Sequence, residues 1–215
     1  MVLRTTRRHK GYRSPGRCGR LPDVGRLIVS NAMTVNGAFE APVPEPGGWL
    51  VLDPDTQQAS LEMWQAADAM VMGRKTYEGL ATVWPQMADL PGFETYAQQM
   101  NSMPKYVASR TLSSPLTWNA TLLAGDLADS VRGIKAAHEG NLIVTGAGEL
   151  AHDLLTQDLV DEVWLMVSPY LWGTGPRIFE DVGAMRLEIV ATTTYPSGVV
   201  VLRYRTTRSA APSVP

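Results

Sequence analysis

Residues 69–76 read Ala69-Met70-Val71-Met72-Gly73-Arg74-Lys75-Thr76, an apolar run followed at once by a glycine, two cations and a hydroxyl. The apolar run is typical of a short buried strand, and Gly73 permits a tight turn after it. Thr76 opens the next helical pattern, and the free N–H groups of such a helix form an anion site beside Arg74 and Lys75. Taken alone, the segment fits an ordinary capped helix with two solvated cations equally well.

Two later segments have the same arrangement after an apolar strand. Residues 106–111 end in Ser109-Arg110-Thr111, whose guanidinium between two hydroxyls suits a phosphate, although a polar loop is the simpler explanation in isolation. Residues 142–150 end in Thr145-Gly146-Ala147-Gly148-Glu149-Leu150, whose small residues would let a ligand approach the backbone at a helix N-terminus. In an open α/β sheet all three turns lie at the carboxyl ends of strands, where ligands bind.

The rest of the chain alternates between strand and helix patterns. Residues 27–30 and 163–167 are apolar runs typical of buried strands, and residues 126–138 have a helical pattern. Asp53-Pro54-Asp55 predicts a helix start, with Asp55 as the simplest cap and apolar positions continuing to Ala67. Residues 187–194 and 198–205 predict a hairpin. We therefore predict an α/β fold with a mostly parallel central sheet, helices on both faces and a C-terminal antiparallel hairpin.

Length and composition predict one globular domain over residues 26–207, with a flexible tail over 208–215. Cys18 is the only cysteine, which excludes a disulfide framework and a cysteine-based metal cluster. We expect a cytoplasmic protein without a metal. No run approaches the roughly 18 apolar residues of a membrane span, so we also expect no membrane partner.

Residues 1–25 have a composition unlike that of the domain. Residues 1–26 carry eight Arg or Lys and only Asp23 as an acid, whereas the remainder carries eleven basic and twenty acidic residues. The segment lacks apolar periodicity and the apolar core of a signal peptide, which favours a disordered passive leader. A nucleic-acid tether is the alternative, although we do not expect nucleic acid as a partner.

The motifs together resemble the dihydrofolate-reductase-like family. The resemblance is closest to stand-alone relatives of the reductase half of the bacterial riboflavin-biosynthesis deaminase–reductase, and it runs from about Leu27 to Arg205. It rests on four segments in the family's order, which are residues 71–78, 105–112, 143–150 and 159–176. The resemblance implies a three-layer dihydrofolate-reductase-like fold for this chain.

The resemblance also implies NADPH as the cofactor. The 2′-phosphate would lie between Arg74 and residues 109–111, the pyrophosphate at Thr76 and residues 146–150, and the nicotinamide near Ala32. The residues that it assigns to the cofactor are Ala32, Gly73, Arg74, Lys75, Thr76, Ser109, Arg110, Thr111, Gly146, Ala147, Gly148, Glu149 and Leu150. Related reductases hold the pair that corresponds to Gly146-Ala147 in a cis peptide, so we expect one here.

The substrate pocket implied by the resemblance comprises Asn36, Gly37, Phe39 and either Trp49 or Trp84, although both tryptophans could simply be core or lid residues. The riboflavin reductases usually have Asp where Asn36 stands, and an amide cannot supply an acidic proton. We therefore expect Asn36 to act in catalysis by positioning the substrate. In dihydrofolate reductases the pocket acid lies on the first helix, where Asp53, Asp55 and Glu62 are the candidates. A second departure is Ala147, where the family usually has glycine.

The function implied is an NADPH-dependent reductase that transfers a hydride to a small heterocyclic or carbonyl substrate. The alternatives are a true dihydrofolate reductase and a nucleotide-binding protein without turnover. A zinc deaminase half is excluded, because that chemistry requires a His or Cys triad and the sequence has one cysteine and no H-x-E segment. We expect a homodimer, because relatives commonly pair and because an apolar surface is expected at five residues, Leu165, Val167, Tyr170, Leu171 and Trp172.

Overall fold

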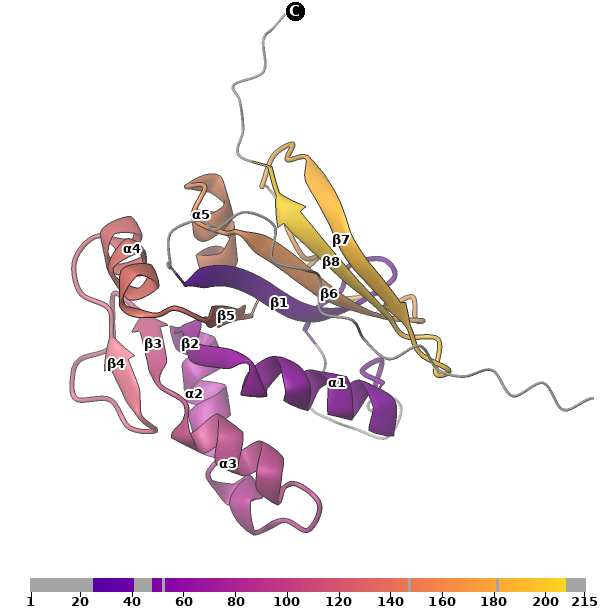
Figure 1. Ribbon diagram of the computed structural model, residues 1–215, viewed down its shortest axis with the longest axis horizontal. Helices are drawn as coiled ribbons and strands as arrows, with labels where there is room; N and C mark the ends of the chain where they lie inside the picture. The colour runs from indigo at the N-terminus through magenta and orange to yellow at the C-terminus, as the bar shows by residue number, and fades with distance from the viewer. Residues whose placement is uncertain (1–24, 41–47, 52, 147, 181, 208–215) are drawn as a thin grey trace, which may run out of the picture.

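The computed structural model of the chain describes residues 25–40, 48–51, 53–146, 148–180 and 182–207 (Figure 1). The predicted leader, apart from Gly25, and the predicted tail over 208–215 lie outside these ranges. Ala147 also lies outside them, and with it the expected cis peptide at Gly146-Ala147.

Strands and helices alternate along most of the chain. The strands are β1 (Arg26–Thr34), β2 (Ala67–Gly73), β3 (Lys105–Ala108), β4 (Ala120–Leu122), β5 (Asn141–Thr145), β6 (Glu162–Ser168), β7 (Leu187–Thr194) and β8 (Val200–Thr206). The helices are α1 (Pro54–Gln65), α2 (Arg74–Val83), the 3-10 helix η1 (Gln86–Asp89), α3 (Glu94–Ser102), α4 (Leu127–Ala137) and α5 (Glu149–Thr156). Within the described ranges, no helix has the length and apolar character required to cross a membrane.

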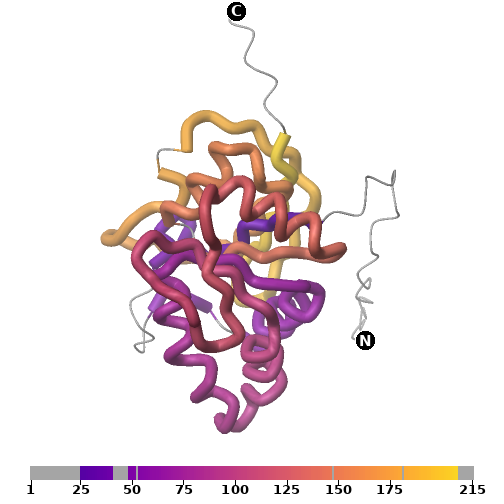
Figure 2. Tube along the Cα trace, turned by 90° about the vertical axis from the view of Figure 1, so that its left-hand side faces the viewer, coloured from indigo at the N-terminus to yellow at the C-terminus, as the bar shows by residue number. Residues whose placement is uncertain are grey.

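The eight strands form one sheet in the order β4-β3-β2-β5-β1-β6-β8-β7. The strands from β4 to β6 pair in parallel, and β8 runs antiparallel to both β6 and β7. The predicted mostly parallel sheet and its C-terminal antiparallel hairpin are therefore confirmed. The tube in Figure 2 shows the C-terminal hairpin at the end of the molecule opposite α2 and α3.

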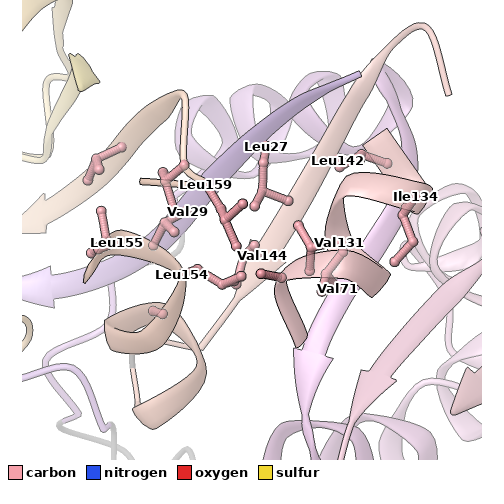
Figure 3. Close-up of a cluster of buried hydrophobic side chains, with 14 of the residues drawn as sticks. Leu27, Val29, Val71, Val131, Ile134, Leu142, Val144, Leu154, Leu155 and Leu159 are labelled. Atoms are coloured by element: carbon pink, nitrogen blue, oxygen red, sulfur yellow. The ribbon is translucent and has the colours of Figure 1, made fainter. Parts of the chain in front are cut away.

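Helices cover both faces of the sheet, and the burial of the strands follows from this (Figure 1). Helices α4 and α5 lie on one face, where Leu27, Val29 and Val71 pack with Val131 and Leu154 (Figure 3). Helices α1, α2 and α3 lie on the other face. The intervening residues of the same strands, such as Ile28, Met70 and Ile143, pack there against Trp64, Tyr77 and Met100. Successive residues of these strands thus alternate between two cores, so the strands read as continuous apolar runs.

Three details differ from the predictions. Helix α1 ends at Gln65, so Ala67 opens β2 instead of continuing the helix. Its N-cap is Asp53 and not Asp55, because the Asp53 carboxylate accepts hydrogen bonds from the N–H groups of Asp55 and Thr56. Helix α3 and strand β4, which lie between α2 and α4, were not predicted from the sequence.

The apolar surface expected for a dimer is smaller than predicted. Leu165 is buried in the core and Val167 and Trp172 are partly covered, which leaves Tyr170 (42% exposed) and Leu171 (76% exposed) as its open members. Ile189 and Val190 of the edge strand β7 are also exposed, but the register Ile189–Tyr204–Val163 places them level with the start of β6, whereas Tyr170 and Leu171 follow its end. The homodimer stays a prediction, and of the predicted surface only Tyr170 and Leu171 are exposed.

Candidate functional site

The turns after β2 and β5 pack directly against each other. Gly146 has a φ of +89°, and a Cβ added to it would lie 2.6 Å from the hydroxyl oxygen of Thr76 in α2. A Cβ on Gly73 would lie 3.9 Å from Leu150 in α5. The structure thus brings together the two segments at which the family resemblance implies a pyrophosphate. Glycine allows their backbones to approach this closely.

The helices that follow these two turns lack side-chain caps. Helix α2 begins after Gly73 and α5 begins after Gly148, and neither N-terminus donates a hydrogen bond to the side chain of its N-cap residue. By contrast, Asp53 and Asp126 cap α1 and α4. The first N–H groups of α2 and α5 are therefore left for an anionic ligand, which the helix dipole also favours.

The third predicted turn lies beside the first. Gly73 and Ala108 are register partners in β2 and β3, so residues 109–111 continue next to Arg74. The Ser109 hydroxyl oxygen accepts hydrogen bonds from the N–H groups of Thr111 (3.1 Å) and Leu112 (3.0 Å). This hydroxyl therefore shapes its own turn, and Arg110 remains as the exposed charge of the segment.

The cations of these turns have no partner within the part of the chain that the structure describes. Arg74, Lys75 and Arg110 are exposed, and none of them forms a hydrogen bond or an ion pair with a described residue. Arg74 and Arg110 follow neighbouring strands. A fork of N–H donors is well suited to a phosphate, and the shared phosphate site of the two arginines stays a prediction.

A pocket of about 430 Å³ adjoins these turns on the face covered by α1, α2 and α3. Its floor includes a row of four residues that are register partners on adjacent strands, Thr145 on β5, Ser30 on β1, Trp164 on β6 and Arg203 on β8. A second row consists of Ala32, Met166 and Val201. Because Thr145 precedes Gly146, the pocket begins where the β5–α5 turn begins.

Helices supply the aromatic walls of the pocket. Trp84, which follows α2, stacks on Tyr96 of α3 with ring centroids 5.0 Å apart and planes 7° apart, and Phe93 lies beside them on the lining. The Tyr96 hydroxyl shares a hydrogen bond of 2.8 Å with Ser60 of α1. Burial raises the pKa of Tyr96, so this phenol stays protonated near neutral pH.

The expected substrate residues are divided between the pocket and its surroundings. Ala32 and Trp84 line the pocket, whereas Asn36, Gly37, Phe39 and Trp49 are not among its described lining residues. Trp49 is 1% exposed, and its indole N–H donates to the backbone oxygen of Glu40 at 3.4 Å. It is therefore a core residue in this structure.

The Asn36 side chain joins two loops. Its amide oxygen accepts hydrogen bonds from the backbone N–H of Trp172 (3.0 Å) and the hydroxyl of Thr34 (2.8 Å), and its amide nitrogen donates to the Trp172 carbonyl (2.9 Å). These contacts use the groups that were expected to meet the substrate. They favour a structural role for Asn36, and the substrate-positioning role stays a prediction.

No carboxylate lines the pocket among the described residues. Asp53 caps α1, and Asp55 and Glu62 are exposed on that helix, so none of the three predicted candidates is a lining acid. Four polar lining residues were not predicted from the sequence, Ser60, Tyr96, Tyr195 and Arg203. Arg203 had a usable signal, because it continues the alternation of Val199 and Val201 and so places a charge at an inward-facing position.

The order of the mostly parallel sheet, its antiparallel final hairpin and the helices on both faces define a dihydrofolate-reductase-like α/β domain. The chain belongs to the RibD C-terminal domain family, whose profile matches residues 26–201. It is 27% identical over 180 residues to the uncharacterised protein YyaP of Bacillus subtilis strain 168, covering 83% of this chain and 94% of YyaP.

Solved structures have the same fold. A putative riboflavin biosynthesis protein from Shewanella sp. PV-4 superimposes with a TM-score of 0.62 at 22% identity, covering 85% of this chain and 99% of that protein. Dihydrofolate reductase from Enterococcus faecalis, solved in complex with NADP(H), superimposes with a TM-score of 0.57 at 15% identity, covering 85% and 96% of the two chains.

Proposed function

We propose that the protein is an NADPH-dependent reductase of the riboflavin-reductase-like type, which transfers a hydride to a C=N or C=O carbon of a small heterocyclic or carbonyl substrate. One observation carries the proposal. The turns that meet at Gly146 and Thr76 lie at the edge of a pocket of about 430 Å³, because Thr145 lines that pocket. A site for a nucleotide and a site for a small substrate are therefore contiguous.

The residues of the turns fit this cofactor. The uncapped N-termini of α2 and α5 would hold the pyrophosphate, with Thr76 between them. Arg74 and Arg110 would hold the 2′-phosphate, and the nicotinamide would face Ala32 and Thr145 at the edge of the pocket. When bound, NADPH supplies the hydride, and the protein supplies orientation and electrostatics.

The chain itself would orient the acceptor and exclude water from it. The stacked Trp84 and Tyr96 provide a flat apolar wall for a planar substrate. The Tyr96 and Ser60 hydroxyls form a pair that can donate a hydrogen bond to the acceptor's nitrogen or oxygen. With no carboxylate among the described lining residues, the proton would come from these hydroxyls or from solvent.

The absence of a carboxylate from the described lining residues disfavours dihydrofolate reductase. That enzyme uses a pocket acid on its first helix, whereas α1 contributes Thr56, Gln57, Ala59, Ser60, Met63 and Trp64 to this pocket. A nucleotide-binding protein without turnover would have the same turns, so only an activity measurement separates it from a reductase.

The test is NADPH oxidation, followed optically, with a panel of C=N heterocycles, dihydrofolate and small carbonyl compounds. We expect oxidation that depends on one of the heterocycles or carbonyls and not on dihydrofolate. Ala59→Trp, which fills the pocket from α1, should abolish turnover but leave NADPH binding intact. Ala136→Trp, an exposed position on α4, is the control. NADPH binding without substrate-dependent oxidation across the panel would contradict the proposal.

A further inference from the structure

Arg203 is the one charged side chain among the described residues that line the pocket. The other polar lining groups are hydroxyls, amides and backbone groups, and the remaining surface is largely aromatic and aliphatic. A guanidinium in such surroundings loses part of its hydration, and an opposite charge within hydrogen-bonding distance normally compensates for that loss.

That compensation is missing for Arg203 in the part of the chain that the structure describes. Its side chain forms no ion pair or hydrogen bond there, and its Nε atom is buried without a hydrogen-bond partner. Asp53, Asp55 and Glu62 are near enough to raise the pKa of the lining residue Tyr195, and Glu162 accepts a hydrogen bond from the indole of Trp164. None of these four carboxylates lies within 4 Å of the nitrogen atoms of the guanidinium.

The position of Arg203 is fixed by the sheet. The guanidinium carbon lies 4.2 Å from the centroid of the Trp164 ring, which belongs to its register partner on β6. Trp164 is held in turn, because its indole N–H donates to Glu162 at 2.8 Å and Glu162 pairs with Arg26 at 3.1 Å. One face of the guanidinium is therefore covered by the indole, its Nε is buried, and its two terminal nitrogen atoms form no hydrogen bond with a described residue.

The strand order sets the distance between this cation and the cofactor end of the pocket. Arg203, Trp164 and Ser30 stand opposite one another on the adjacent strands β8, β6 and β1. Neighbouring strands are about 4.8 Å apart, so the backbone of Arg203 lies roughly 10 Å from that of β1, which also carries Ala32. Because the guanidinium lies over Trp164 of β6, a substrate must span less than this backbone distance to reach from Arg203 to β1.

We propose that the substrate of this pocket is a flat, anionic molecule whose carboxylate or phosphate binds Arg203, while its reducible end lies by Ala32 and Thr145. A bicyclic ring, or one ring with a short arm, has the length that this arrangement requires. The assignment rests on the proposed function, because it takes the pocket to be the substrate site of the reductase. The anion-binding step needs neither the cofactor nor turnover.

Calorimetric titration of the full chain with three matched probes tests the proposal. These are 2-naphthoate, 2-naphthyl phosphate and the neutral 2-naphthamide. We expect at least one of the two anions to bind about 10- to 150-fold more tightly than the amide, the range for charge-assisted hydrogen bonds. The two anions distinguish a carboxylate substrate from a phosphate ester. Equal affinity of all three probes would overturn the proposal without the need for any variant.

Two substitutions assign the preference to Arg203. Arg203→Met keeps an apolar stem on Trp164 and should abolish the preference, while Arg203→Lys should keep part of it. Arg205→Met removes the same charge from an exposed position on the same strand and should leave the preference unchanged. A preference that survives in Arg203→Met, or that Arg205→Met reduces equally, would overturn the assignment.

NADPH binding, measured in parallel, separates this proposal from the proposed function. If the probes show the Arg203-dependent preference but NADPH does not bind, the reductase assignment fails and the anion site stands. If NADPH binds and is oxidised but the probes show no preference, the anion site fails and the reductase assignment stands.

Discussion

Gly146 lies against Thr76, so closely that a Cβ on the glycine would come within 2.6 Å of the threonine hydroxyl oxygen. Thr76 lies in the first turn of α2, which follows β2, and Gly146 lies in the turn after β5; the two strands are not consecutive in the chain but are neighbours in the sheet. Their contact fixes the spacing between the N-termini of α2 and α5. Any ligand that bridges the two helix termini therefore depends on this pair.

Substituting Gly146 with alanine should weaken NADPH binding and destabilise the fold. Alanine is strained at a φ of +89°, which costs roughly 1–2 kcal/mol, and its Cβ pushes against Thr76. Urea unfolding and calorimetric titration with NADPH measure the two effects. Gly79→Ala is the matched control, because it lies in α2 with no atom within 4 Å of the added Cβ. It should stabilise the helix by about 0.5–1 kcal/mol.

A double-mutant cycle tests whether the contact itself is responsible. Thr76→Ala removes the hydroxyl that a Cβ at Gly146 would meet, so it should relieve part of the Gly146→Ala defect. Residues in contact are expected to show such non-additivity. Strictly additive losses in stability would mean that the strained φ accounts for the whole effect.

Arg74 and Arg110 should determine the preference for NADPH over NADH. The two cofactors differ by a 2′-phosphate, and neither arginine is paired with a described residue. Losing one charge-assisted contact of about 1.5–3 kcal/mol should weaken NADPH binding roughly 10- to 150-fold and barely change NADH binding. Arg74→Met and Arg110→Met, titrated with both cofactors, provide the measurement.

Lys75→Met serves as the control for that experiment. Lys75 is also exposed and unpaired among the described residues, but we expect it one helical step away from the phosphate, so its loss should have a smaller effect. Equal affinity of the unmodified protein for NADPH and NADH would rule out a 2′-phosphate site at these arginines.

The strands and turns were predictable because their signals are local. Residues 69–72 and 142–144 are buried on both sides, so their apolar runs have few alternatives to a parallel strand. Helix α3 was missed because it buries only Ala97 and Met100 and is otherwise polar. Strand β4 was missed because its three residues carry no clear alternation at the sheet edge.

The pocket was less predictable, because its residues meet only through the strand order. Arg203 and Thr145 share one row across the sheet although β6 and β7 separate β8 from β5 along the chain. Asn36 shows that a family motif does not reveal the hydrogen-bond partners of a side chain. Its place in a family motif predicted a substrate contact, whereas its partners, the backbone of Trp172 and the hydroxyl of Thr34, could be found only in the folded structure.

Asn36→Ala should loosen the loop that contains Trp172. The substitution removes three hydrogen bonds at an exposed site, and we expect a loss of about 1–2 kcal/mol in stability and faster proteolysis within residues 170–178. KM should stay unchanged, because the side chain is not among the described residues that line the pocket. A raised KM at unchanged stability would instead support the substrate-positioning role.

The homodimer prediction can be tested through the two residues that are exposed. Light scattering at micromolar concentration should report a dimer, and Leu171→Glu should shift it towards the monomer, because it places a charge on the most exposed large apolar side chain of that surface. Val83→Glu, at a 50% exposed position at the end of α2, is the control. A monomer in the unmodified protein would remove the prediction.

Lys105 should make the stability of the protein depend on pH above neutrality. The residue is 1% exposed, its ammonium group donates to the Asn101 carbonyl at 3.1 Å and lies 4.2 Å from the Trp118 ring centroid, and burial lowers its pKa to about 8 from 10.5. Below pH 8 both the folded and the unfolded chain carry this proton. Between pH 8 and 10.5 the folded chain releases it first, so the free energy of unfolding gains a positive contribution as pH rises.

Lys105→Met removes that contribution, so the free energy of unfolding should change with pH at different slopes in the variant and the unmodified protein. Relative to the variant, the unmodified protein should gain stability from pH 8 to 10, by no more than about 1.4 kcal/mol per pH unit, the limit for one proton. Urea unfolding of both proteins at several pH values measures the difference, in which the titration of tyrosines cancels. The prediction concerns the direction in which the stability difference changes with pH. Its absolute size at any one pH also includes the contacts to Asn101 and Trp118 that the substitution removes. A constant difference across this range would show that the folded chain does not lower the pKa of Lys105.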